Sequence, residues 1–199
     1  VSSDPSLELI AIGVSTGGPI ALQSILPALP ADFSVPVVVS QHMPPQFTRS
    51  LAERLNDRSA LEVREAEDGM LLKAGRAIVA AGGRHLTFEQ RGARSVVRTP
   101  EQPADSSHVP SVNVMLESAH DAFGGRILTV IMTGMGEDGL QGTRTVKEAG
   151  GTVFAQDKAS SVVYGMPRVV TEEGLVDAVL PLEELSDAIT RAVGAPARP

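Results

Sequence analysis

The sequence predicts an α/β fold: a doubly wound, mostly parallel sheet with helices on both faces and an antiparallel meander or hairpin insertion. Two observations predict it. Four short apolar runs rich in β-branched residues are continuous rather than alternating, as in parallel strands covered on both faces. They are residues 7–14, 35–40, 127–133 and 152–155. Segments with helical spacing lie between them, and alternating strands and helices favour this architecture.

Three predicted helices have a clear apolar face, and two predicted helices end at a pair of glycines. The faces are Leu22, Ile25, Leu26 and Leu29; Phe47, Leu51 and Leu55; and Leu116, Ala119 and Phe123. Their spacing of three to four residues is that of one helix side. Gly-Gly pairs end the helices predicted before residue 124 and over 140–149, and a last helix is predicted over 182–193.

The stretch from residue 69 to 98 differs from the rest of the chain. Short runs at 77–80, 85–90 and 95–98 are separated by turn residues, which predicts an antiparallel meander inserted into the sheet or at its edge. Residues 99–110 are predicted to form an irregular polar loop. We expect one catalytic domain over residues 7–193, with disordered tails at 1–6 and 194–199. Because the chain begins with Val1, we expect it to be a fragment or a processed form.

Composition excludes several classes of function. A net charge of -7 and the lack of a basic stripe argue against a nucleic-acid partner. No apolar stretch approaches the ~18 residues of a membrane span. The chain has no Cys, which fits a cytoplasmic protein. Its four His are dispersed without metal-ligand spacing, so we expect no metal and no cofactor.

Polar residues follow the predicted strands where the carboxyl ends of parallel strands meet. Ser15 lies in Gly-Val-Ser-Thr-Gly, which matches the G-x-S-x-G turn that exposes a serine nucleophile. His42 follows the second strand and is placed for general-base work or is a surface-loop histidine. The carboxylate that would orient it is Asp138 or Asp157, and spacing alone does not choose between them.

Two function classes fit these residues. The order Ser, His, Asp along the chain differs from that of ordinary α/β-hydrolases, so a serine hydrolase of another kind is predicted. The alternative is a binding protein whose residues 13–18 hold a phosphate or nucleotide, although no G-x-G-x-x-G and no P-loop lysine is present.

Separated motifs together resemble one family, the catalytic domain of the bacterial chemotaxis protein-glutamate methylesterase, CheB. They include Ile-Gly-Val-Ser-Thr-Gly-Gly-Pro at 12–19, Gln-His-Met-Pro-Pro at 41–45, Thr-Gly-Met-Gly-Glu-Asp-Gly at 133–139 and Ala-Gln-Asp-Lys-Ala-Ser-Ser-Val-Val-Tyr-Gly-Met-Pro at 155–167. The matches span nearly the whole chain in the family's order. The chain departs from the family after Ser111 and Val112. The family usually has Asp and then a large apolar residue, whereas this chain has Asn113 and then Met115 and Leu116.

The resemblance implies a triad of Ser15, His42 and Asp138, with the backbone N–H groups of Thr16 and Met135 as oxyanion donors. It implies hydrolysis of glutamate methyl esters on cytoplasmic helices of chemoreceptors, and deamidation of receptor glutamines, without a cofactor. It also implies a phosphorylatable receiver domain as a regulatory partner, and this chain contains no such domain.

Overall fold

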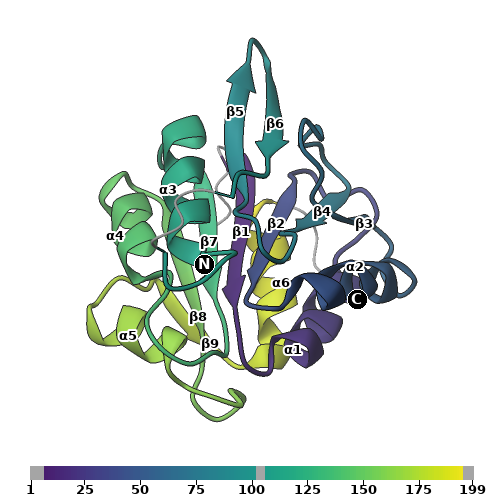
Figure 1. The fold of residues 1–199 in the computed structure, drawn as a ribbon. Helices are drawn as coiled ribbons and strands as arrows, with labels where there is room; N and C mark the ends of the chain where they lie inside the picture. The colour runs from purple at the N-terminus through teal and green to yellow at the C-terminus, as the bar shows by residue number, and fades with distance from the viewer. Residues whose placement is uncertain (1–6, 102–105, 195–199) are drawn as a thin grey trace.

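A seven-stranded parallel sheet forms the centre of the computed structural model, which describes residues 7–101 and 106–194 (Figure 1). The strand order is β3 (Glu62–Glu65), β4 (Arg76–Val79), β2 (Val37–Gln41), β1 (Leu9–Val14), β7 (Ile127–Ile131), β8 (Thr152–Gln156) and β9 (Ala178–Leu180). The predicted doubly wound parallel sheet is thereby confirmed. The predicted tails lie outside the described residues, apart from Gly194.

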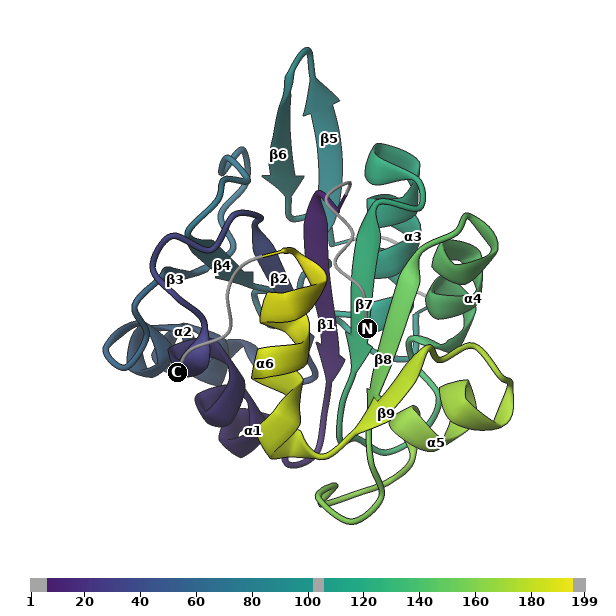
Figure 2. The same cartoon turned by 180° about the vertical axis from the view of Figure 1, so that it is seen from behind.

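Helices cover both faces of this sheet (Figures 1 and 2). One face packs against α1 (Gly18–Ile25), the short 3-10 helix η1 (Leu26–Ala28), α2 (Pro45–Asn56) and α6 (Leu182–Ala192). The other packs against α3 (Val112–Phe123), α4 (Leu140–Glu148) and α5 (Met166–Glu172). Because β1, β2 and β7 are buried along their whole length on both faces, most of their residues are apolar, with Ser40, Gln41 and Thr129 as buried polar exceptions.

The structure corrects the prediction for the middle of the chain. Residues 77–80 do not belong to an antiparallel meander, because β4 pairs in parallel with both β2 and β3. Strands β3 and β9 and helix α5 were not predicted. β3 reads Glu-Val-Arg-Glu and has a single buried residue, so it carries little apolar signal. β9 has only three residues, none of them buried.

In the predicted meander, antiparallel pairing is confined to a hairpin and an isolated bridge from Leu71 to Val96. The hairpin consists of β5 (Thr87–Arg91) and β6 (Arg94–Arg98), joined by a two-residue turn in which Gly92 has a φ of 63°. The hairpin projects from the end of the sheet opposite the carboxyl end of β1 (Figure 1). The Phe88 ring packs edge-on against Phe123 of α3, with ring centroids 6.1 Å apart.

The carboxyl ends of β2, β1 and β7 are neighbours in this sheet. The connection from β1 leads to β2 on one side, whereas β7 lies on the other side, so the strand order reverses at β1. Ligand and catalytic sites of doubly wound sheets collect at such a reversal. None of the helices in residues 7–101 and 106–194 is long and apolar enough to cross a membrane.

We predict that Phe154→Ala lowers the free energy of unfolding by about 3–5 kcal/mol, because it opens a cavity in a close-packed core. Phe154 is fully buried on β8, in the cluster between the sheet and helices α1, α2 and α6. Urea unfolding followed by circular dichroism measures the loss. Phe47→Ala is the control, since that ring is 52% exposed. Equal losses for the two variants would contradict the assigned core.

Candidate active site

The sheet brings Ser15 and His42 together through its register. Val14 of β1 pairs with Gln41 of β2, so the next residues, Ser15 and His42, leave neighbouring strands side by side. The backbone N–H of His42 donates to the carbonyl of Val14 at 3.2 Å. Adjacent strands lie about 4.8 Å apart, so the two loops begin within side-chain reach of each other.

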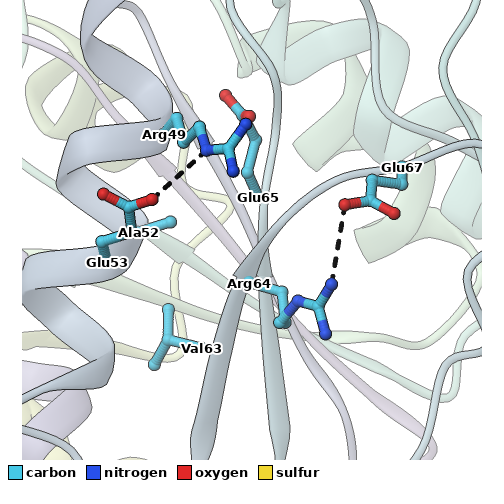
Figure 3. A pocket seen from close by; sticks show the side chains of 7 residues that line it. All are labelled: Arg49, Ala52, Glu53, Val63, Arg64, Glu65 and Glu67. Carbon is cyan, nitrogen blue, oxygen red and sulfur yellow. Dashed lines mark hydrogen bonds and ion pairs between the residues drawn. The ribbon is translucent and has the colours of Figure 1, made fainter.

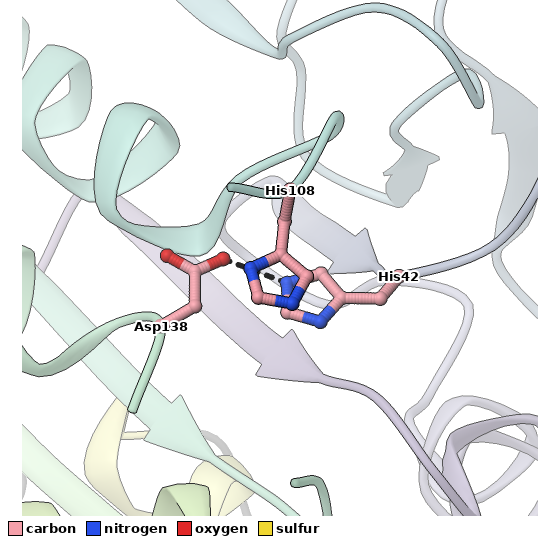
Figure 4. A group of neighbouring side chains, drawn as sticks. All are labelled: His42, His108 and Asp138. Carbon is pink, nitrogen blue, oxygen red and sulfur yellow. Dashed lines mark hydrogen bonds and ion pairs between the residues drawn. The ribbon is translucent and has the colours of Figure 1, made fainter. Parts of the chain in front are cut away.

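The third candidate, Asp138, lies beside the His42 ring (Figure 4). Its Oδ2 is 2.7 Å from Nε2 of His42, and both side chains are largely buried. The Nδ1 atom of His42 is also buried and has no hydrogen-bond partner among the described residues. With Nε2 held by a carboxylate, Nδ1 is the nitrogen left to accept a proton. In the familiar serine-protease triad, the two nitrogens have the opposite roles.

Asp138 is held at the N-terminus of α3. Its Oδ1 accepts from Ser111 Oγ at 2.9 Å and from the backbone N–H of Asn113 at 3.0 Å, and its Oδ2 accepts from the N–H of Val112 at 2.7 Å. A helix N-terminus has unsatisfied N–H groups and favours negative charge. Burial disfavours the charged carboxyl, but the bonds from His42, Asn113 and Val112 outweigh it and lower the pKa of Asp138 from 3.8 to about 2.

Asn113, the departure from the family pattern, links α3 to α4. Its Oδ1 accepts from the backbone N–H groups of Gly139 at 3.0 Å and Gly142 at 2.9 Å, at the start of α4. Its own N–H donates to Asp138, the residue before Gly139. Asn113 therefore fixes the segment that carries Asp138, through an amide oxygen that stays uncharged. Met115 is fully buried in the core between the sheet and α3.

The glycines around Ser15 have structural explanations that need no phosphate. Gly17 has a φ of 87° and caps the N-terminus of α1. A Cβ on Gly13 would overlap Val112, and one on Gly18 would overlap the side chain of Gln41. No described non-glycine residue has a positive φ, so Ser15 itself lacks left-handed strain. The left-handed conformation falls two residues after the serine, at Gly17.

The β7–α4 loop passes directly over this turn. A Cβ on Gly134 would lie 2.8 Å from the Cβ of Ser15, so glycine permits the close approach. Thr133 Oγ1 donates to the carbonyl of Thr16 at 2.8 Å. The backbone N–H groups of Thr16 and Met135 have no acceptor among the described residues, and both residues are exposed. The two candidate oxyanion donors therefore belong to loops that contact each other.

The structure adds one residue that sequence reasoning missed. His108 stacks on His42, with ring centroids 4.1 Å apart and planes 8° from parallel (Figure 4). Burial and the neighbouring His42 lower the pKa of His108, against a smaller opposing effect of Asp138. The residue follows no strand, so its sequence position gave no signal. Its one clue is its place three residues before Ser111, the N-cap of α3.

The rival carboxylate, Asp157, is engaged within its own turn. Its Oδ1 accepts from the backbone N–H of Ser160 at 2.9 Å and from Ser160 Oγ at 2.6 Å. It shapes the loop after β8, whereas Asp138 contacts the imidazole.

His42, His108 and Asp138 also form a cluster whose possible metal-ligand atoms all lie within 4.8 Å of one another. The geometry suits a metal poorly. Nitrogen lone pairs lie in the ring planes, and two stacked parallel rings do not direct them at one point, as a tetrahedral site requires. Asp138 already binds Nε2 of His42.

Two cavities lie near these elements. One of about 400 Å³ borders the site and is lined partly by His108, Asn113 and Asp138. Another, of about 130 Å³, lies between α2 and β3 (Figure 3). Its arginines pair with its glutamates: Arg49 with Glu53 and Arg64 with Glu67. Its arginines are therefore paired. The cavity beside Asp138 is lined by neither Ser15 nor His42, so it adjoins the site on the Asp138 side.

Fold and site define the class: a doubly wound α/β protein with a serine, a histidine and a carboxylate at adjacent strand ends. Comparison with known proteins then gives the family. Residues 10–189 match the family model described as CheB methylesterase. The chain belongs to the CheB methylesterase family.

Individual relatives agree with this assignment. Proteins named protein-glutamate methylesterase/protein-glutamine glutaminase from Saccharophagus degradans and Moorella thermoacetica are 50% and 49% identical over 90% and 95% of this chain. The chain spans about half of their length, 48% and 45%. The crystal structure of the Thermotoga maritima CheB methylesterase catalytic domain superposes with a TM-score of 0.89 at 42% identity, covering 95% of this chain and 98% of that one.

We predict that the stabilising effect of the Asp138 carboxylate disappears in acid. The folded-state pKa of about 2 lies below the ordinary 3.8, so the stabilisation is complete above pH 3.8 and is lost as the pH falls through 2. The difference in unfolding free energy between the native chain and Asp138→Asn should therefore shrink by roughly 1 kcal/mol from pH 6 to pH 3.

Urea unfolding at a series of pH values measures this difference. The control is Glu137→Gln, which neutralises the exposed carboxylate of the residue just before Asp138. A difference for Asp138→Asn that stays constant over this range would show that the carboxylate is not held by hydrogen bonds in the folded state.

Proposed function

We propose that this chain is the catalytic part of a protein-glutamate methylesterase that uses Ser15 as nucleophile, His42 as base and Asp138 as the group that orients the base. The observation that carries the proposal is the 2.7 Å bond between His42 Nε2 and Asp138, next to the turn that presents Ser15. The names of the relatives support the ester of a protein glutamate as substrate.

The reaction follows from the roles of these groups. Nδ1 of His42 takes the proton of Ser15 as its Oγ attacks the ester carbonyl. Asp138 stabilises the resulting imidazolium through Nε2–H. The N–H groups of Thr16 and Met135 stabilise the oxyanion, and a single donor of this kind contributes about 3 kcal/mol. His42 then donates this proton to the departing methoxide oxygen, which leaves as methanol, and water hydrolyses the acyl-enzyme to release the glutamate and regenerate Ser15.

The same acyl-enzyme would form from a glutamine side chain, with ammonia as the leaving group. The names of the relatives also include protein-glutamine glutaminase activity. We propose methylated cytoplasmic helices of chemoreceptors as the substrates, which places the reaction in the cytoplasm. A receiver domain is the regulatory partner that we expect, since the relatives are about twice as long as this chain.

We predict that Ser15→Ala lowers the rate of methanol release from membranes bearing methylated receptors by about 10³-fold or more. Loss of the nucleophile removes the acyl-enzyme route, whereas the binding surface stays intact.

The control is Ser50→Ala, which removes the hydroxyl of an exposed serine on α2. It should release methanol at the rate of the native chain. Undiminished release by Ser15→Ala would disprove the proposed mechanism, and release by neither the native chain nor Ser50→Ala would disprove the proposed activity.

A further inference from the structure

We propose that Gln41 is a positioning residue that fixes the turn of the nucleophile against the turn of the base. The inference rests on the proposed function, because it assumes that Ser15 passes its proton to His42. Gln41 is the last residue of β2 and is 1% exposed. Its Nε2 donates to the carbonyl of Ser15 at 2.9 Å and to the carbonyl of His42 at 3.0 Å.

One amide group therefore donates both of its hydrogen bonds to the two residues between which the proton is transferred. The ladder between β1 and β2 ends with the pair of Val14 and Gln41 and the bond from the His42 N–H to Val14. Beyond that point, each chain turns away into its own helix. The Gln41 side chain continues the connection by one residue, at the level where Ser15 and His42 must stay aligned.

The Ser15 carbonyl is fixed from two directions. It accepts from the N–H of Gly18 at 2.9 Å, which closes the turn, and from Gln41. Both of its lone pairs are thus used. Because the carbonyl is held, rotation of the Ser15 backbone is restricted, and the direction of its Cα–Cβ bond is restricted with it.

Gly18 shows that the turn is shaped around this glutamine. A Cβ at Gly18 would overlap Oε1 of Gln41. No positive φ requires glycine at this position, so the space for the side chain explains it. The second Gly of the Gly-Gly pair, which the sequence offered as a phosphate cradle, instead leaves room for an internal amide.

The acceptor end of Gln41 distinguishes a positioning role from one in stability alone. Oε1 is buried and has no hydrogen-bond partner among the described residues. A buried polar atom left unsatisfied is destabilising, and an apolar side chain of similar size would avoid this cost. For stability alone, an apolar side chain would therefore suit this buried position better than an amide. The amide does supply donors for the carbonyls of Ser15 and His42.

Gln156 provides a comparison within the same sheet. It ends β8 as Gln41 ends β2, and it too is fully buried. Its Oε1 accepts from the N–H of Thr133 at 2.9 Å, and its Nε2 donates to the carbonyl of Ser160 at 2.9 Å. Both ends of Gln156 are satisfied, and it joins the loops after β7 and β8. Of these two glutamines, only Gln41 joins the nucleophile to the base.

The test is the kinetics of Gln41→Met, which keeps the volume and removes both donors. Methanol release from methylated receptor membranes gives kcat and KM at a temperature where every variant is folded by circular dichroism. We expect kcat to fall at least 10-fold with KM within twofold, because misplacement by about 1 Å costs up to 100-fold in rate. A role in stability alone leaves kcat per folded molecule unchanged.

Two further variants complete the test. Thr190→Val removes a buried hydroxyl that donates to the Ser186 carbonyl within α6, and we expect native kcat and KM. Gly18→Ala displaces Gln41 without altering it, so it should also lower kcat at least 10-fold, and it gives the answer if Gln41→Met does not fold.

The outcomes separate this inference from the proposed function. If the native chain releases methanol, Ser15→Ala does not, and Gln41→Met or Gly18→Ala keeps the native kcat, the inference is overturned and the function stands. An equal fall in kcat for Thr190→Val would likewise overturn it. If the native chain releases no methanol, the function fails and the inference falls with it.

Discussion

The buried carboxylate of Asp138 is the constraint on which the site depends. It lies at the N-terminus of α3 and accepts from Ser111, Val112, Asn113 and His42. A buried charge is tolerated only when its surroundings compensate it, and here four donors do so. The same bonds fix the β7–α4 loop against α3 and the imidazole against that loop. One electrostatic requirement thus positions three separate segments.

Close approach of backbones makes this arrangement possible. Gly13 gives space to Val112 of α3, Gly134 lets the β7–α4 loop reach Ser15, and Gly18 admits Gln41. Side-chain amides then join the segments, with Asn113 between α3 and α4 and Gln156 between the loops after β7 and β8. The loops at this edge of the sheet are therefore held by polar bonds to rigid elements, which is the condition for preorganised chemistry.

Much of the fold was predictable because burial leaves a direct trace in sequence. Strands β1, β2, β7 and β8 consist mostly of buried apolar residues, and the helices that cover them repeat their apolar residues every three to four positions. The prediction was wrong for β4, because a short apolar run with turn residues on both sides resembles a strand of a hairpin. It missed β3 and β9, whose few buried residues leave no pattern. Pairing partners are nonlocal, so spacing alone does not reveal them.

The sequence by itself determined the fold class, the family resemblance and the three strand ends that carry Ser15, His42 and Asp138, since these depend on local patterns. The tertiary structure decided which carboxylate contacts the imidazole, which ring nitrogen it binds, and that His108 stacks on His42. It also brought Gln41 to the carbonyl of Ser15 and Asn113 to the N–H of Gly139, each 26 residues away in the chain. Such contacts arise from strand order and helix placement, which no short segment encodes.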